Sequence, residues 1–197
     1  MTISLPRHSR QTWGWTLATI AALLTAAVSA SDPATWDLFV VSCFGAGGGL
    51  WVLWRRDVLS VGEILVGAVL LRVAFFPLLP GLSDDMFRYV WDGWLQWQGV
   101  NPYRYAPADP ALAAFQDAEL YDHLNSEDYY SVYPPISQMI FALGGAAAES
   151  NWTVGYFVIK GVFVLFELAG LFLLSRLASA RNLLLYAWNP LVLVEVA

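Results

Sequence analysis

Two adjacent acids, Asp84 and Asp85, stand where the chain leaves an apolar run, and carboxylates are among the side chains that can transfer protons. Ser83 stands before them, and serine is a favourable N-cap residue. The helix dipole also favours acids in the first turn. A helix is therefore expected to begin at this point. A structural role fits the pattern equally well, because both acids would complement the dipole and Asp84 would pair with Arg88 one turn later.

The residues that follow the acidic pair divide between two faces of the expected helix. Its apolar positions are Phe87, Val90, Trp91, Trp94 and Leu95. Its polar positions are Asp85, Arg88, Asp92 and Gln96. This spacing predicts a helix from Ser83 to about Gln98 that lies flat on a membrane, with its tryptophans Trp91 and Trp94 toward lipid and its charged side chains toward water.

The loop beyond this helix is rich in aromatic residues and prolines. Gly99 and the Asn-Pro pair that follows it should end the helix, since glycine suits a C-terminal cap and the residue before proline avoids helical geometry. A second short helix is expected from Ala111 to Asp122, and an aromatic corner from Tyr129 to Pro135. Such rings can stack against sugars, although an aromatic belt at the membrane boundary is the commoner role for any single ring.

The composition places these residues in a membrane protein. Hydrophobic residues make up 58% of the chain and charged residues only 13%, which is too little polar surface for a soluble globule of 197 residues. The segment from Gly81 to Tyr133 holds nine acids and two arginines, so the acidity belongs to one loop. Cys43 is the only cysteine, which excludes an intramolecular disulfide and a thiolate zinc site. We expect membrane lipid as a partner and no nucleic acid.

Three apolar runs precede the loop, each near the roughly 20 residues that cross a bilayer as a helix. They are Thr12–Ala30, Ala34–Trp54 and about Val61–Leu79. Basic residues flank spans on the cytoplasmic side, so the amino terminus and the Arg55-Arg56 pair are predicted to be cytoplasmic. The third span must then lead outward, which places the acidic loop outside the cytoplasm. Loops of this length are usually functional or disordered, and this one is too aromatic to be disordered.

The apolar segment Ile136–Ala148 has only about 13 residues, so we expect it to lie along or dip into the outer surface. The alternative is that it crosses, which would place Arg176 and Arg181 outside. In the first arrangement, the run Trp152–Leu174 travels inward, which puts Arg176 in the cytoplasm, and a last run, Asn182–Ala197, heads outward. The fold class is an all-α polytopic membrane protein. It is divided into three amino-terminal helices (1–80), an extracytoplasmic loop with interfacial helices (81–150) and further transmembrane helices (151–197). Since the last run stops without a polar tail, the chain is expected to be the amino-terminal part of a larger protein.

Several charged residues fall within the expected spans, where they are costly unless they are paired or face protein or water. They are Glu63, Arg72, Lys160, Glu167 and Glu195. Lys160 and Glu167 share a helix face, so such groups could line a site or a path. Packing against further helices would explain them equally. The glycines 47–49 are expected to serve close helix packing.

A set of motifs occurs in a fixed order along the chain. It consists of a Ser-Asp-Asp turn after a span, Arg88-Tyr89-Val90-Trp91-Asp92-Gly93, the segment Gly99–Pro107, Tyr133-Pro134-Pro135, and Ala187-Trp188-Asn189-Pro190-Leu191. Together these motifs resemble those of bacterial GT-C glycosyltransferases, and are most similar to mannosyltransferase-like members that use polyprenyl-phosphate sugars. The ordered set covers residues 80 to 191.

The resemblance implies a catalytic acid in the first extracytoplasmic loop, with Asp85 as the matching position and Asp84 as the alternate. It implies inverting transfer of a sugar, mannosyl or another hexosyl, from a polyprenyl-phosphate donor to a glycan or glycolipid acceptor at the bacterial inner membrane. Arg88, Arg104 or a divalent metal ion held by the two acids would stabilise the leaving phosphate. The remaining substrate-binding positions implied are Tyr89, Asp92, Asn101, Tyr103, Tyr133, Gln138 and Asn189. Members of the family continue through more spans that complete the donor groove, so this chain alone is expected to be inactive.

Two other classes of function fit parts of the sequence. A transporter or flippase fragment would use the intramembrane charges as a translocation path, which explains the spans but not the loop. A non-catalytic membrane scaffold would keep the loop only for assembly. Sugar transfer that is lost on Asp85→Asn and kept on Lys160→Met would favour the enzyme.

Overall fold

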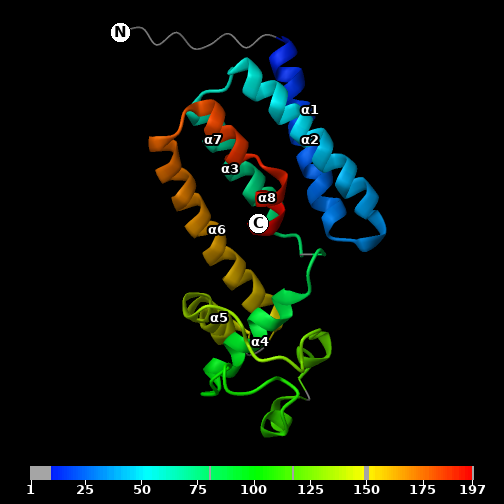
Figure 1. Cartoon of the computed structure of the whole chain (residues 1–197), viewed down its shortest axis with the longest axis vertical. Coiled ribbons are helices and arrows are strands. Elements are labelled where there is room, and N and C mark those ends of the chain that lie inside the picture. Colours follow the sequence, from blue (N-terminus) through cyan, green and yellow to red (C-terminus); the bar gives the residue numbers. More distant parts are fainter. Residues whose placement is uncertain (1–9, 80, 117, 149–150, 197) are drawn as a thin grey trace. The chain divides into compact units, whose positions relative to one another are not determined.

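The computed structural model describes residues 10–79, 81–116, 118–148 and 151–196, and this part of the chain is helical with no strand (Figure 1). The described residues form two compact units, each with its own hydrophobic core. The first unit combines residues up to Leu82 with those from Val164 onward, and the second runs from Ser83 to Phe163. The long helix α6 contributes to both.

Three helices are long and apolar enough to cross a membrane, as the sequence predicts for these regions. They are α1 (Arg10–Ala30), α2 (Trp36–Arg56), which is continuous with the short 3-10 helix η1 (Pro33–Thr35), and α6 (Trp152–Leu177). Large apolar side chains on α2 and α6 point outward from the protein, among them Phe44, Leu165 and Phe166. An outward apolar surface of this kind is typical of a lipid-facing helix. The fold is therefore that of an all-α protein with three candidate membrane spans.

The helices α1 and α2 approach closely at one of the three glycines predicted to serve packing. A Cβ atom on Gly49 would collide with the Thr19 hydroxyl of α1, so only glycine fits there. Thr19 itself donates a hydrogen bond to the Trp15 carbonyl at 2.8 Å, which keeps its hydroxyl satisfied inside the contact. Gly47 and Gly48 face open space, so the packing role applies to Gly49 alone.

The expected third span is not one long helix. The helix α3 (Val61–Phe75) has 15 residues, fewer than the roughly 20 that cross a bilayer. It ends just before Pro77, which has no N–H for the next helical hydrogen bond. Glu63 is correspondingly not a charge buried within a span. It forms a capping box at the start of α3, where its carboxylate accepts the Ser60 backbone N–H at 2.8 Å.

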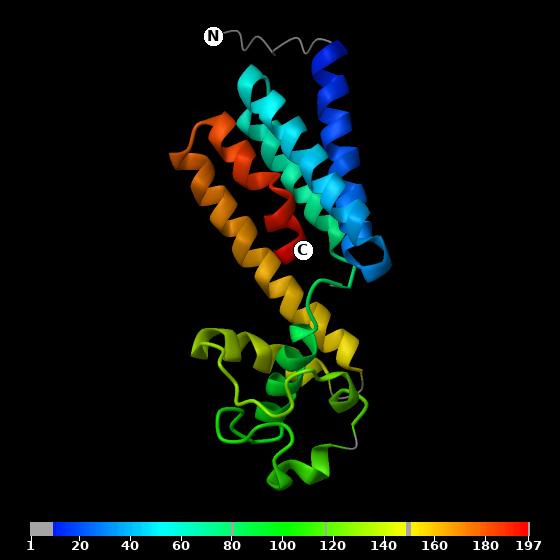
Figure 2. The ribbon, with the colours of Figure 1, turned by 45° about the vertical axis from the view of Figure 1, so that its right-hand side comes forward.

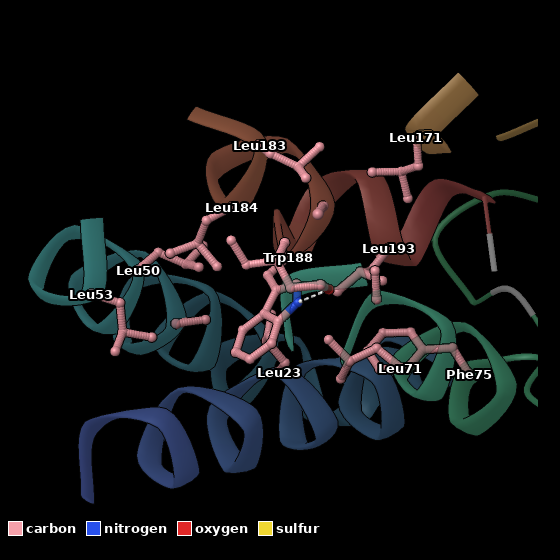
Figure 3. Packing of buried hydrophobic residues seen from close by; sticks show 14 of the residues in the cluster. Leu23, Leu50, Leu53, Leu71, Phe75, Leu171, Leu183, Leu184, Trp188 and Leu193 are labelled. Carbon is pink, nitrogen blue, oxygen red and sulfur yellow. Dashed lines mark hydrogen bonds between the residues drawn. The ribbon is translucent and has the colours of Figure 1, made fainter. Parts of the chain in front are cut away.

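The expected last run is also broken, into α7 (Ala180–Ala187) and α8 (Pro190–Val196). Asn189 precedes a proline and so leaves the helical conformation, and its side-chain oxygen accepts the Leu191 N–H at 2.9 Å to cap α8. Trp188 lies at the break and points into the core of the first unit (Figure 3), where its indole N–H donates to the Ile64 carbonyl of α3 at 3.0 Å. The predicted end of this run at Ala197 and the side chain of Glu195 lie outside the described residues.

The second unit contains α4 (Asp85–Trp97), α5 (Pro135–Ala147) and the first turns of α6. The loop between α4 and α5 carries two 3-10 helices, η2 (Pro110–Phe115) and η3 (Tyr121–His123) (Figure 2). The prediction of a single short helix over residues 111–122 is therefore wrong in detail. Asp109 accepts the Ala111 N–H at 2.8 Å and starts η2, which ends after two turns.

Backbone contacts at glycines hold the helices of the second unit together. A Cβ on Gly93 of α4 would overlap the Phe141 carbonyl of α5, and one on Gly145 would overlap Gly93. A Cβ on Gly155 of α6 would lie 2.8 Å from the carbonyl oxygen of Gly144 in α5. These pairs place α5 directly against α4 on one side and against the first turn of α6 on the other.

The orientation predicted for α4 is wrong. Trp91 is 0% exposed and lies in the core of the second unit, and Asp92 of the predicted water-facing side is also 0% exposed. Arg88 is buried as well. Both the apolar and the polar face of α4 pack against protein, because α5 and the loop cover them. Trp94 is half-buried against Trp91 and Phe115.

Candidate functional site

The centre of the second unit is a buried ion pair within one helix. Arg88 Nε lies 2.8 Å from Asp92 Oδ1, and both side chains are nearly inaccessible to solvent. The partner expected from the sequence was Asp84, which stands one turn before Arg88 rather than one turn after it. A buried charge must be paired to be tolerated, so each of these residues requires the other.

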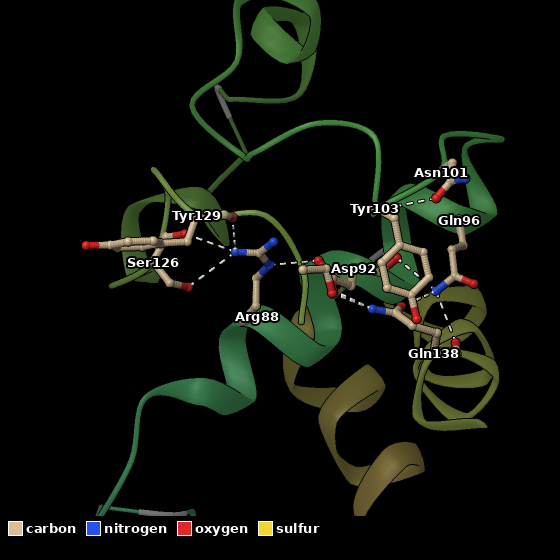
Figure 4. A network of polar contacts seen from close by, with 9 residues as sticks. Arg88, Asp92, Gln96, Asn101, Tyr103, Ser126, Tyr129 and Gln138 are labelled. Carbon is tan, nitrogen blue, oxygen red and sulfur yellow. Dashed lines mark hydrogen bonds and ion pairs between the residues drawn. The ribbon is translucent and has the colours of Figure 1, made fainter. Parts of the chain in front are cut away.

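The pair extends into a hydrogen-bonded network with α5 (Figure 4). The Gln138 amide N–H₂ donates to Asp92 Oδ2 and to Ser131 Oγ, each at 2.7 Å. Gln96 in turn donates to Gln138 Oε1 at 2.8 Å. Both oxygens of the Asp92 carboxylate and both ends of the Gln138 amide are therefore used inside the protein.

Arg88 also fixes the segment that leads to α5. Its Nη1 donates to the carbonyl oxygens of Ser126 at 2.9 Å and Tyr129 at 3.0 Å. Two buried donors, Arg88 Nη2 and Trp91 Nε1, have no partner among the described residues. The bonded part of the guanidinium acts as a clamp between α4 and residues 126–131. The sequence placed Arg88 and Gln96 on one face of the helix but did not identify Ser126 and Ser131, since no local pattern links these serines to that face.

The two acids first considered for proton transfer differ from Asp92 in their surroundings. Asp84 is exposed and Asp85 is half-buried in the first turn of α4. The N-cap residue of α4 is Asp84, without a side-chain cap hydrogen bond, and not the predicted Ser83, whose hydroxyl accepts the Asp85 backbone N–H at 3.2 Å from one residue further back. Within the described part of the chain, neither carboxylate makes a hydrogen bond or an ion pair. Both carboxylates therefore remain available to other groups.

Tyr133 lies beside Asp85 in a cluster of aromatic rings. Its ring packs edge-on against Tyr89 at 5.0 Å and against Phe141 at 5.4 Å. The Tyr103 hydroxyl donates to the Tyr133 carbonyl at 2.5 Å. Burial raises the pKa of the Tyr133 phenol, and the negative charge of Asp85 raises it further. The phenol therefore keeps its proton at neutral pH and acts as a hydrogen-bond donor.

The remaining predicted substrate residues occupy three different settings. Arg104 is exposed and lies over the ring of Tyr105 at 5.3 Å, and its guanidinium makes no hydrogen bond or ion pair within the described residues. Asn101 accepts the Tyr103 backbone N–H at 2.9 Å and so shapes the turn after α4. Asn189 belongs to the first unit, where it caps α8. The predicted site residues between 84 and 138 thus all belong to the second unit, and Asn189 lies outside that unit.

Metal binding would rest on Asp84 and Asp85 alone. No group of three or more His, Cys, Asp or Glu side chains able to hold a metal ion occurs in residues 10–79, 81–116, 118–148 and 151–196. Two neighbouring carboxylates supply only part of the six oxygen ligands that Mg²⁺ takes, so substrate phosphate and water would have to provide the others.

The charges predicted inside the spans are mostly accounted for by pairing. Arg72 and Glu167 form a buried bidentate pair in the first unit, with Nε–Oε2 and Nη2–Oε1 distances of 2.7 Å. Arg72 Nη1 also donates to the Ala187 carbonyl at 2.7 Å, at the end of α7. Lys160 lies over the ring of Tyr156 at 5.7 Å, in the second unit. Lys160 and Glu167, which were expected to share a helix face, therefore belong to different units and have different surroundings.

Comparisons of the chain with protein-family models, with curated proteins and with solved structures find no match.

Proposed function

We propose that the intact gene product is a membrane glycosyltransferase that moves a hexosyl group from a polyprenyl-phosphate donor to an extracytoplasmic hydroxyl acceptor. The observation that carries this proposal is that the acids at the start of α4 and within it differ in whether their carboxylates are already bonded. Asp92 is neutralised by Arg88, whereas Asp85 is half-buried and its carboxylate is free of hydrogen bonds and ion pairs within the described residues. A general base needs a carboxylate that is positioned but not already occupied.

The proposed reaction is a single displacement. The Asp85 carboxylate takes the proton of the acceptor hydroxyl while the hydroxyl oxygen attacks the anomeric carbon of the sugar. The bond from that carbon to the phosphate oxygen breaks, and the phosphate leaves with the electron pair as polyprenyl phosphate. Attack opposite the leaving group inverts the anomeric centre. Asp85 then returns its proton to water.

Surrounding side chains support this assignment in two ways. The protonated Tyr133 phenol lies close enough to Asp85 for the charge of the acid to raise its pKa, so it can donate a hydrogen bond to a sugar oxygen nearby. The exposed ring of Tyr103, whose hydroxyl bonds to the Tyr133 carbonyl, offers a flat surface to a sugar nearby.

The departing phosphate needs positive charge, and the two arginines differ in their availability. Arg88 is buried and bonded to Asp92 and to backbone carbonyls. Arg104 is exposed, and its guanidinium donors are not used within the described residues. We therefore assign phosphate recognition to Arg104 and a positioning role to Arg88.

The test is sugar transfer by the intact gene product in membranes supplied with a radiolabelled polyprenyl-phosphate sugar. Asp85→Asn keeps the size of the side chain but removes its basicity, so turnover should fall by about 100-fold or more while donor binding is retained. Asp84→Asn is the matched control, because it changes the adjacent exposed acid in the same way. It should keep turnover within about threefold of the parent.

Two results would argue against the proposal in different ways. Loss on Asp84→Asn with normal turnover of Asp85→Asn would move the base to Asp84 and leave the reaction class standing. Normal transfer by both single variants and by the double variant would remove this loop from catalysis.

A further inference from the structure

The second unit exposes a row of large apolar side chains on α5, here called the α5 patch: Ile136, Met139 and Leu143. Their side chains are 74%, 70% and 56% exposed, respectively. The spacing of three and four residues places them on one face of the helix. The opposite face carries Gln138, Phe141 and Gly145, all of which are buried against the rest of the unit. Burying such a patch against an apolar surface is favourable.

The α5 patch and the loop before it differ in charge. No charged residue occurs between Tyr129 and Ala148, although the segment before it is strongly acidic. A surface without charge next to a hydrophobic row can enter the acyl boundary of a bilayer, whereas an acidic surface would be repelled by anionic lipid and costly to dehydrate.

If α6 crosses the bilayer, its connection to α5 sets the level at which α5 lies. The helix α6 has 26 residues and is about 39 Å long, which exceeds the ~30 Å hydrocarbon core. If α6 crosses the bilayer, its first turn therefore stands at the membrane boundary. Gly144 of α5 is in backbone contact with Gly155 in that turn, and α5 crosses it (Figure 2). With 13 residues, about 20 Å, α5 is too short to span.

We propose that the α5 patch inserts into the boundary between lipid and water at the start of α6, and that α5, rather than α4, is the helix of this unit that contacts lipid. The contact holds the second unit at a fixed level at the end of α6. This inference concerns membrane contact alone and does not rest on sugar transfer.

The experiment places an environment-sensitive fluorophore on single cysteines of the full chain, in a Cys43→Ser background, reconstituted into phosphatidylcholine vesicles. Met139→Cys reports on the α5 patch, and Leu143→Cys is a second probe on the same face. Ala114→Cys on η2 is the matched control, since Ala114 is also exposed and η2 lies at the end of the unit away from α5 in both views (Figures 1 and 2).

Lipids with a nitroxide near the headgroup should quench the label at position 139 at least about threefold more than the label at position 114, and aqueous iodide should show the reverse order. Leu143→Cys should behave as Met139→Cys does. Equal quenching of both sites by iodide would overturn the proposal. Protection of position 139 from both lipid and iodide would also overturn it, because a protein partner or a second copy would then cover the patch.

Discussion

Removal of either member of the Arg88–Asp92 pair should open the second unit. Arg88→Met leaves the Asp92 carboxylate buried with only the Gln138 amide as a donor, and it frees the carbonyls of Ser126 and Tyr129. Asp92→Asn leaves a buried guanidinium without a counter-charge. Both side chains are almost fully buried, so screening by solvent does not reduce the cost. Breaking a buried pair from one side costs about 3–5 kcal/mol.

This cost can be measured as local opening around α4. Leu95 is 1% exposed, so a thiol introduced by Leu95→Cys in a Cys43→Ser background reacts only when the core opens. At about 1.4 kcal/mol per factor of ten, a loss of 3–5 kcal/mol corresponds to a reaction about 140- to 3700-fold faster when Arg88→Met or Asp92→Asn is added to this background. Arg104→Met is the matched control, because this arginine is exposed, and it should change the rate by less than about threefold.

The double variant tests whether the two residues act through each other. Its free-energy cost should fall short of the sum of the two single costs by about 0.5–3 kcal/mol, since the second substitution removes a charge that the first left unpaired. Single variants that react within about threefold of the parent, or costs that add without coupling, would refute the view that this pair holds the unit together.

Two other predictions concern packing and pH. Gly155→Ala should destabilise the full chain in detergent by about 1–3 kcal/mol, because its Cβ would crowd the Gly144 carbonyl, whereas Gly170→Ala on the same helix meets open space and should leave the melting temperature unchanged or higher. Tyr133 has a pKa raised above its unfolded value of about 10, so its contribution to stability is complete below pH 10 and is lost as pH rises toward the folded-state pKa. Tyr133→Phe should therefore make alkaline unfolding less steep above about pH 10, and an unchanged slope would contradict the assignment.

The sequence predicted those elements whose signals are local. The candidate membrane spans α1, α2 and α6 follow from apolar length, and α4 begins and ends within two residues of its predicted bounds. Gly99, at a φ of 78°, takes the left-handed conformation that a glycine C-cap favours, and it follows the last turn of α4. Helix caps, including a glycine at a helix C-terminus, act through their immediate neighbours, so they can be recognised in the sequence.

Breaks inside apolar runs are hard to locate from hydrophobicity alone. Pro77 shortens α3, and the Asn189-Pro190 pair separates α7 from α8, although hydrophobic residues continue on both sides of each break. The backbone groups freed at the second break are bonded from α3, with Arg72 donating to the Ala187 carbonyl. Non-helical backbone at membrane depth is tolerated where protein satisfies it, and that donor is remote in sequence.

The partner of Arg88 could not be chosen from the sequence, because Asp84 and Asp92 stand at equal spacing on either side of it. Contacts with residues remote in sequence decide between them. Gln138 reaches Asp92 from α5, and the carbonyl of Ser126 accepts from the same guanidinium. Asp92 thus gains a second donor, while Asp84 at the exposed helix start remains in contact with solvent.

An apolar helix face in a membrane protein is ambiguous in principle, since lipid and protein core both accept it. For α4 the sequence held one feature that distinguishes the two: Gly93, next to the polar Asp92 and between two tryptophans. A helix that lies on lipid gains nothing from a residue without a side chain, and glycine lowers its helical stability by about 1 kcal/mol. A helix crossed by another gains a direct backbone contact, and Gly93 meets Gly145 of α5 in this way. The paired glycines of α5 would then mark the partner. The helix α5 has no such contact on its outer face, where Ile136 and Met139 are exposed. On this reasoning, that face of α5 is the one that contacts lipid.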